Sequence, residues 1–159
     1  MALKDRVALG TVSGIAATVP PLILNWGFVK LGLVEYYSFQ LSAGVFITKI
    51  MTETPSGMFL GGVVWESAAA FFGILIVYFI NFTGKDYWWL KGIIIPIALI
   101  YILVFGFLFH IGAGHLHSHH LGTNFSLILE NVLFGIITAF LAIHWGKGIL
   151  YTEGSRQKH

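Results

Sequence analysis

The sequence predicts an all-α fold: a polytopic membrane four-helix bundle, formed by a single transmembrane domain over residues 1–159. Of the 159 residues, 57% are hydrophobic and 10% are charged, whereas soluble domains carry about 25% charged residues. The mean hydropathy is +0.82. Four apolar segments are each long enough to cross a hydrocarbon core of about 30 Å, which takes about 20 helical residues. This composition is typical of a chain that lies in a lipid bilayer.

The four predicted spans cover about residues 7–33, 57–80, 88–111 and 125–145. In the first, the apolar run continues well past Ala16 and Ala17, so we expect a retained helix rather than a cleaved signal peptide. Pro20 and Pro21 remove two backbone donors from the middle of this span, which predicts a kink there. A broken, substrate-binding helix of the transporter type is the alternative interpretation of the same prolines.

Two connecting segments have distinct characters. The apolar part of residues 36–51 is too short and too interrupted to cross the bilayer, which predicts an additional interfacial or re-entrant helix between the first two spans. Residues 112–124 form a histidine-rich loop between the last two spans.

The basic residues predict an orientation. With both termini cytoplasmic, the inner flanks hold seven of the nine Lys and Arg residues, and the outer side holds only Lys30 and Lys49. Cytoplasmic flanks are enriched in Lys and Arg. We therefore expect a bacterial plasma-membrane protein whose histidine-rich loop faces outward.

The glycine spacing and several longer stretches carry a resemblance. These stretches are "GTVSGIAATVPPLILNWGFVKLGL", "FQLSAGVFI" and "FSLILENVLFGIITAFLAIHWGK". Together they resemble small, uncharacterised four-span bacterial integral membrane proteins over most of the chain. The resemblance implies a four-helix membrane fold and no particular activity, and the histidine cluster and Glu66 are not part of it.

Ionisable residues inside a span are costly, by about 2.5 kcal/mol or more at the bilayer centre. Glu66 shares a helical face with Gly62, Ala69 and Gly73, so we expect it to face a neighbouring helix. Glu130 lies about a turn and a half inside the fourth span. By depth, we expect His110 or Glu130 to be the partner of Glu66.

The histidines and the two glutamates fall in one predicted layer near the outer surface, and three interpretations of this layer stay open. The first is a divalent transition metal, with zinc favoured, because imidazole and carboxylate are suitable ligands and the chain has no cysteine. An extended "HLHSH" would place alternate histidines on one side, with His120 pointing away. The candidate ligands are His110, His115, His117, His119, Glu66 and Glu130.

The second interpretation is a proton site, in which a buried carboxyl couples to histidines that titrate near neutral pH. The third is structural: the loop histidines are solvated and the carboxyls hydrogen-bond across helices. The sequence thus predicts a metal-binding or proton-binding layer for sensing or transfer, or else a structural or partner-binding membrane subunit.

An enzyme is not expected from these residues. His115, His119 and His120 spell one histidine box like those of membrane desaturases, but such oxidoreductases need several boxes. The expected partners are the lipid bilayer and either further copies of the chain or a larger membrane complex. A net charge of +2, dispersed along the chain, argues against nucleic acid.

Overall fold

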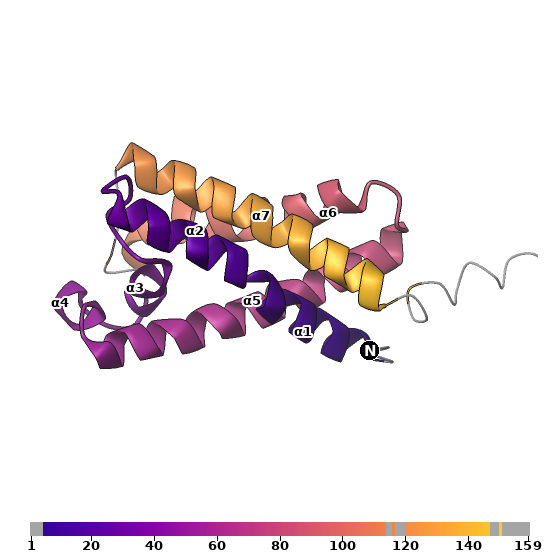
Figure 1. Ribbon diagram of the computed structural model, residues 1–159, viewed down its shortest axis with the longest axis horizontal. Coiled ribbons are helices and arrows are strands. Elements are labelled where there is room, and N and C mark those ends of the chain that lie inside the picture. Colours follow the sequence, from indigo (N-terminus) through magenta and orange to yellow (C-terminus); the bar gives the residue numbers. More distant parts are fainter. Residues whose placement is uncertain (1–4, 114–115, 117–119, 147–149, 151–159) are drawn as a thin grey trace, which may run out of the picture.

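The computed structural model describes residues 5–113, 116, 120–146 and 150, and in this part of the chain the regular structure is entirely helical (Figure 1). Four stretches are long and apolar enough to cross a membrane: Arg6–Lys30, Pro55–Thr83, Trp88–Phe107 and Leu121–Trp145. The predicted all-α class and the four candidate spans are therefore confirmed, with boundaries shifted by a few residues.

The first span consists of two helices, α1 (Arg6–Ala17) and α2 (Val19–Lys30), which meet at Thr18. The Asp5 side chain caps α1 by accepting a 2.7 Å hydrogen bond from the backbone N–H of Val7. Pro20 and Pro21 lie in the first turn of α2, where a missing N–H is tolerated because those donors have no helical partner. The predicted kink is present as this break.

Between the first two spans are two short helices, α3 (Ser38–Ala43) and α4 (Lys49–Thr52). Both pack against the beginning of α5 (Pro55–Thr83) (Figure 1). The approach is close enough that a Cβ atom on Gly61 of α5 would collide with the backbone carbonyl of Phe39. The segment is thus held against the long helices by backbone contact.

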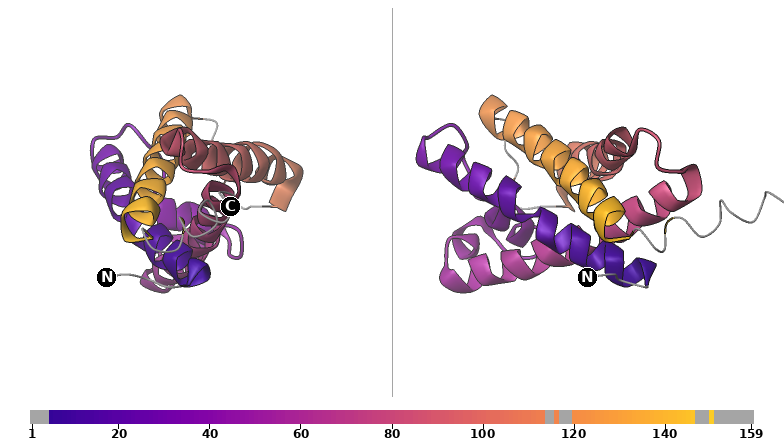
Figure 2. Two further views of the ribbon diagram at one scale, coloured as in Figure 1. Left: turned by 90° about the vertical axis from the view of Figure 1, so that its right-hand side faces the viewer. Right: turned by 45° about the vertical axis from the view of Figure 1, so that its right-hand side comes forward.

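The third span changes character at Pro96. It begins as α6 (Trp88–Ile95) and continues as the π-helix η1 (Pro96–Ala113), in which hydrogen bonds run from residue i to i+5. Pro96 has no N–H to donate, so the α-helical ladder is interrupted at this residue. Figure 2 shows η1 standing apart from the other long helices. Only 11% of the apolar stretch of this span is buried, against 50% of that of α7 (Leu121–Trp145).

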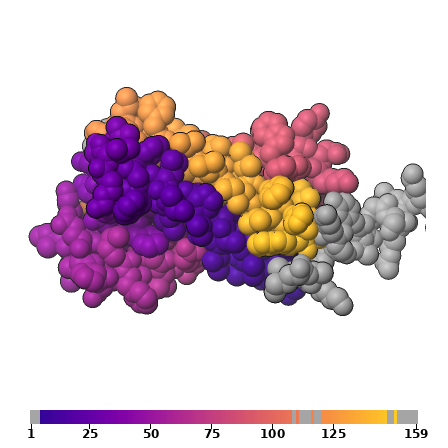
Figure 3. Space-filling model, viewed as in Figure 1, coloured from indigo at the N-terminus to yellow at the C-terminus, as the bar shows by residue number. Residues whose placement is uncertain are grey.

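Small residues let the long helices approach closely. Cβ atoms on Gly10 and Gly14 of α1 would overlap the backbone of α5 at Ile74 and Ala69, and one on Gly73 would overlap the carbonyl of Gly10. Backbone contact of this kind is the usual basis of helix packing in lipid. These close contacts between small residues occur within one chain. Figure 3 shows α7 lying between α6 on one side and α1 on the other.

Candidate site: two carboxyl groups within the spans

Glu130 is the centre of a buried polar cluster on α7. Its side chain is 1% exposed. Its Oε1 accepts hydrogen bonds from Asn25 Nδ2 at 3.1 Å and Ser126 Oγ at 2.5 Å, and its Oε2 accepts one from Ser38 Oγ at 2.8 Å. We call these four residues the Glu130 cluster. Three donors satisfy a carboxyl group whose burial would otherwise be costly.

The Glu130 cluster also fixes the start of α3. Asn25 Oδ1 accepts a 2.9 Å hydrogen bond from the backbone N–H of Ser38, the first residue of α3. The first N–H groups of a helix have no hydrogen-bond acceptor inside the helix. Asn25 supplies the acceptor for one of them, the N–H of Ser38. A second connection lies nearby, where the backbone N–H of Glu35 donates to Thr123 Oγ1 at 3.2 Å. The segment after α2 is therefore joined to α7 at two points.

Sequence reasoning identified Glu130 but did not place Asn25, Ser38 or Ser126 beside it. Ser126 lies four residues before Glu130 on the same helix, a spacing that brings side chains together, so it could have been found. Ser38 could not, because its contact depends on the chain folding back over 92 residues.

Glu66 makes a different contact. It lies on α5 and is half-buried, and its Oε1 lies within hydrogen-bonding distance of Thr18 Oγ1, at 3.0 Å. Its Oε2 is buried and has no hydrogen-bond partner among the described residues. The expected partners were His110 or Glu130; the observed partner is Thr18, the residue at the break between α1 and α2.

The Thr18 hydroxyl is shared between two acceptors. Besides Glu66, it lies 2.7 Å from the carbonyl oxygen of Ile15 in the last turn of α1. A hydroxyl has only one hydrogen to donate. The shorter distance favours the Ile15 carbonyl oxygen as the acceptor. The contact between Thr18 and Glu66 is then a hydrogen bond only if the carboxyl group of Glu66 carries a hydrogen.

A cavity of about 150 Å³ is lined by residues from the neighbourhood of both carboxyl groups. Thr18 and Glu130 both line it, and most of its remaining lining is apolar. Trp65 also lines it, and the indole Nε1 of this residue is buried with no partner in the described part of the chain. The cavity therefore lies between the α1–α2 break, α5 and the Glu130 cluster.

The predicted metal ligands fall into two groups. His115, His117 and His119 lie outside the described residues. Of the described candidates, His110 is exposed near the end of η1, while Glu66 and Glu130 take part in the separate contacts above. Within residues 5–113, 116, 120–146 and 150, no three His, Asp or Glu side chains come close enough to hold a metal ion. The metal hypothesis, with its loop and membrane ligands, stays a prediction.

Outside the spans, Lys49 and Tyr36 form an exposed pair. Lys49 Nζ donates to Tyr36 Oη at 3.0 Å and lies 5.2 Å from the centre of the tyrosine ring. The hydrogen bond from its ammonium group to Tyr36 raises the pKa of Lys49 above its ordinary value. This pair fixes the beginning of α4 relative to the segment before α3.

Comparison with known proteins gave no match: no protein-family model, curated protein or solved structure is similar to this chain. The resemblance to four-span bacterial membrane proteins stays a prediction.

Proposed function

We propose that this chain is an integral membrane protein that binds a proton at Glu66, and that the proton controls the bend between α1 and α2. The position of the Thr18 hydroxyl carries the proposal: it lies 2.7 Å from the Ile15 carbonyl oxygen and 3.0 Å from Glu66 Oε1. Because the hydroxyl has one hydrogen, it cannot donate fully to both acceptors.

A neutral Glu66 resolves this competition. If Thr18 donates to Ile15, the contact between Thr18 and Glu66 is a hydrogen bond only when the carboxyl group supplies the hydrogen. An ionised Glu66 would also leave its buried Oε2 charged and without a partner among the described residues, which is costly away from water. Glu130 differs from Glu66 in this respect, because three side-chain donors already form hydrogen bonds with its two oxygens.

Loss of the proton would change the bend. An ionised Glu66 attracts the Thr18 hydrogen more strongly than a carbonyl oxygen does, since hydrogen bonds to charged acceptors are stronger. The Ile15 carbonyl then loses its side-chain donor. Hydrogen bonds from Ser or Thr to a preceding carbonyl influence helix bending, and Thr18 already lies at the break. The protein would thus respond to pH, which is sensing rather than transport.

Infrared spectroscopy of the protein in lipid nanodiscs tests the proposal. We expect a protonated-carboxyl band at neutral pH that disappears in Glu66→Gln and persists in Glu53→Gln, whose side chain is exposed. The distance between spin labels at Val12 and Ile23, two exposed positions on either side of the break, should change with pH in the parent and stay constant in Glu66→Gln. Absence of a band that depends on Glu66 would refute the proposal.

We further propose that the four spans form a bundle in a bacterial plasma membrane, with both termini cytoplasmic and α3 and α4 at the outer interface. The distribution of Lys and Arg supports this orientation. The exposed pair of Lys49 and Tyr36 at these short helices is typical of headgroup depth.

A partner-binding membrane subunit is the second candidate function. It is supported by the third span, of which 11% is buried, leaving residues such as Ile102 and Phe107 more than half exposed. Native mass spectrometry from nanodiscs tests this second candidate. A stable complex with a second copy or with another protein would support a role as a subunit, and a single copy of the chain would oppose it.

A further inference from the structure

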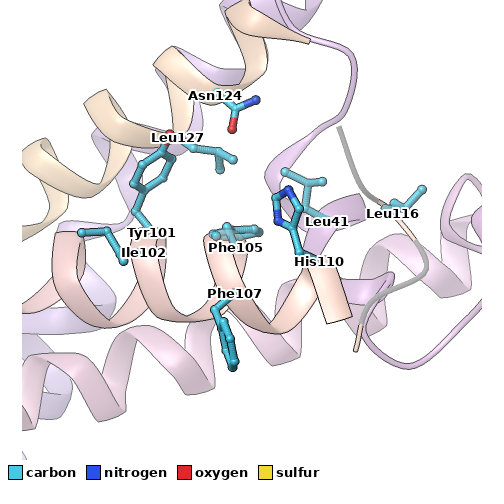
Figure 4. A pocket seen from close by; sticks show the side chains of 10 residues that line it. Leu41, Tyr101, Ile102, Phe105, Phe107, His110, Leu116, Asn124 and Leu127 are labelled. Atoms are coloured by element: carbon cyan, nitrogen blue, oxygen red, sulfur yellow. The ribbon is translucent and has the colours of Figure 1, made fainter. Parts of the chain in front are cut away.

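A second cavity, of about 400 Å³, lies between η1 and α7 (Figure 4). Apolar side chains make up most of its wall, and three polar residues are placed among them. The residues on which the argument rests are Leu41, Tyr101, Phe105, His110, Asn124 and Leu127. A mostly apolar cavity of this size with a few convergent polar groups is the usual form of a small-molecule site.

The polar groups offer both donors and acceptors. The amide nitrogen of Asn124 donates to the carbonyl oxygen of His120 at 3.1 Å, and Figure 4 shows its oxygen directed toward the η1 side of the cavity. The Tyr101 hydroxyl can donate and accept, and the His110 imidazole can do the same. A hydroxyl group, which also donates and accepts, is the simplest chemical complement.

The lining residues that the structure describes favour an uncharged ligand. Of the described residues that line this cavity, none is Lys, Arg, Asp or Glu. A charged headgroup that left water here would need a counter-ion. A neutral head requires only hydrogen bonds.

The two cavities share part of their walls. Leu41 and Phe105 line both the 400 Å³ cavity and the 150 Å³ cavity. The smaller one lies further from the loop end of η1, and its lining is mostly apolar. Cavities with apolar walls stay dry and accept apolar molecules. The two cavities therefore lie next to each other, with Leu41 and Phe105 in the wall of both.

We propose that the 400 Å³ cavity binds a single-chain lipid alcohol. The hydroxyl head lies among Tyr101, His110 and Asn124, and the apolar chain passes Phe105. The ligand enters from the membrane beside the poorly buried third span. Neither Thr18 nor Glu66 is among the residues that line this cavity, so the proposal does not rest on proton binding at Glu66.

Photo-crosslinking tests the site in nanodiscs. Three probes with the same diazirine-bearing chain are compared: a long-chain alcohol, its glycerol monoester and a trimethylammonium analogue. We expect the alcohol to label the Tyr101–Phe105 stretch of η1, displaced by unlabelled alcohol, and the ammonium probe to label it at least fivefold less. Strong labelling by the glycerol ester would widen the class to monoacylglycerols, which share the hydroxyl head and single chain. Equal labelling by the ammonium probe would overturn the proposal.

Two pairs of variants separate binding from general lipid contact. Gly106 lines the larger cavity, and an added Cβ there would have only the Tyr101 carbonyl oxygen within 4 Å, at 3.4 Å. Gly106→Phe should therefore fill the cavity and abolish labelling, while Gly27→Phe, where an added Cβ meets nothing within 4 Å, should not.

The second pair tests the headgroup contact. Tyr101→Phe removes one hydroxyl and should lower affinity for the alcohol by about threefold to tenfold, as expected for one hydrogen bond. Tyr78→Phe, on α5 beside Phe82, should leave the affinity unchanged. Labelling that is the same in Gly106→Phe and in the parent would show that the probe contacts only the lipid-facing surface, and would overturn the proposal.

Discussion

The hydroxyl oxygen of Thr18 lies 3.0 Å from Oε1 of Glu66, and this contact joins the break in the first span to α5. Thr18 is 1% exposed, so solvent does not compete for its hydrogen. A change in the protonation of one side chain can thus reach the backbone of a different helix through one oxygen atom.

Replacement of Thr18 tests that connection. Thr18→Val keeps the shape and removes the hydroxyl, so a protonated Glu66 loses its acceptor. We expect the carboxyl band of Glu66 to move to the frequency of a carboxyl without a hydrogen bond, whereas Thr18→Ser should leave it in place. A band at the same frequency in the Val and Ser variants would exclude Thr18 as the acceptor.

The Glu130 cluster should contribute to stability rather than to switching. Glu130→Leu removes the acceptor of Asn25, Ser38 and Ser126, and buried donors without partners are costly. We expect a decrease in the free energy of unfolding of about 3 kcal/mol, measured by titration with denaturing detergent in micelles. Glu130→Gln keeps one acceptor oxygen and should lose less than half as much. Equal losses in the two variants would contradict this account, because the oxygen that Gln keeps would then contribute nothing as an acceptor.

Much of the fold follows from local patterns. The apolar runs predicted four spans because crossing a bilayer requires about 20 apolar residues, and Pro20 and Pro21 predicted the break because proline cannot donate inside a helix. The partner of Glu66 could not be predicted in this way. Depth along the sequence suggested His110 or Glu130, but the bend at Thr18 brings a residue from the first span to Glu66 instead. The π-helical course of η1 had no sequence signal beyond Pro96.

Close packing of α1 on α5 gives a third prediction. A Cβ on Gly73 would overlap the Gly10 carbonyl and lie 2.8 Å from the Cα atom of Gly14. Gly73→Val should therefore push the helices apart and lower the free energy of unfolding by about 2 kcal/mol. Gly27→Val, where an added Cβ has open space, should change it by about 0.5 kcal/mol or less. Similar losses at the two positions would contradict the observed packing.

The pair of Lys49 and Tyr36 gives a prediction for high pH. Because its hydrogen bond to Tyr36 raises the pKa of Lys49, the pair stabilises the fold fully below the ordinary lysine pKa, and this contribution is lost as the pH rises through the raised value. We expect Tyr36→Phe to lower the pKa of Lys49, as followed by NMR of isotopically methylated lysines. An unchanged Lys49 titration would show that the hydrogen bond is absent in the membrane.

The orientation of the spans is the last prediction, and the absence of cysteine from the chain makes it directly measurable. Ser56 and Thr83 are exposed residues near opposite ends of α5. With both termini cytoplasmic, a membrane-impermeant maleimide added to intact cells should label Ser56→Cys and should label Thr83→Cys only after the membrane is permeabilised. The cysteine-free parent controls for background. If the two positions react from the same side, α5 does not cross the membrane. If Thr83→Cys alone reacts in intact cells, the orientation is the reverse, and Lys and Arg do not set it as the positive-inside rule requires.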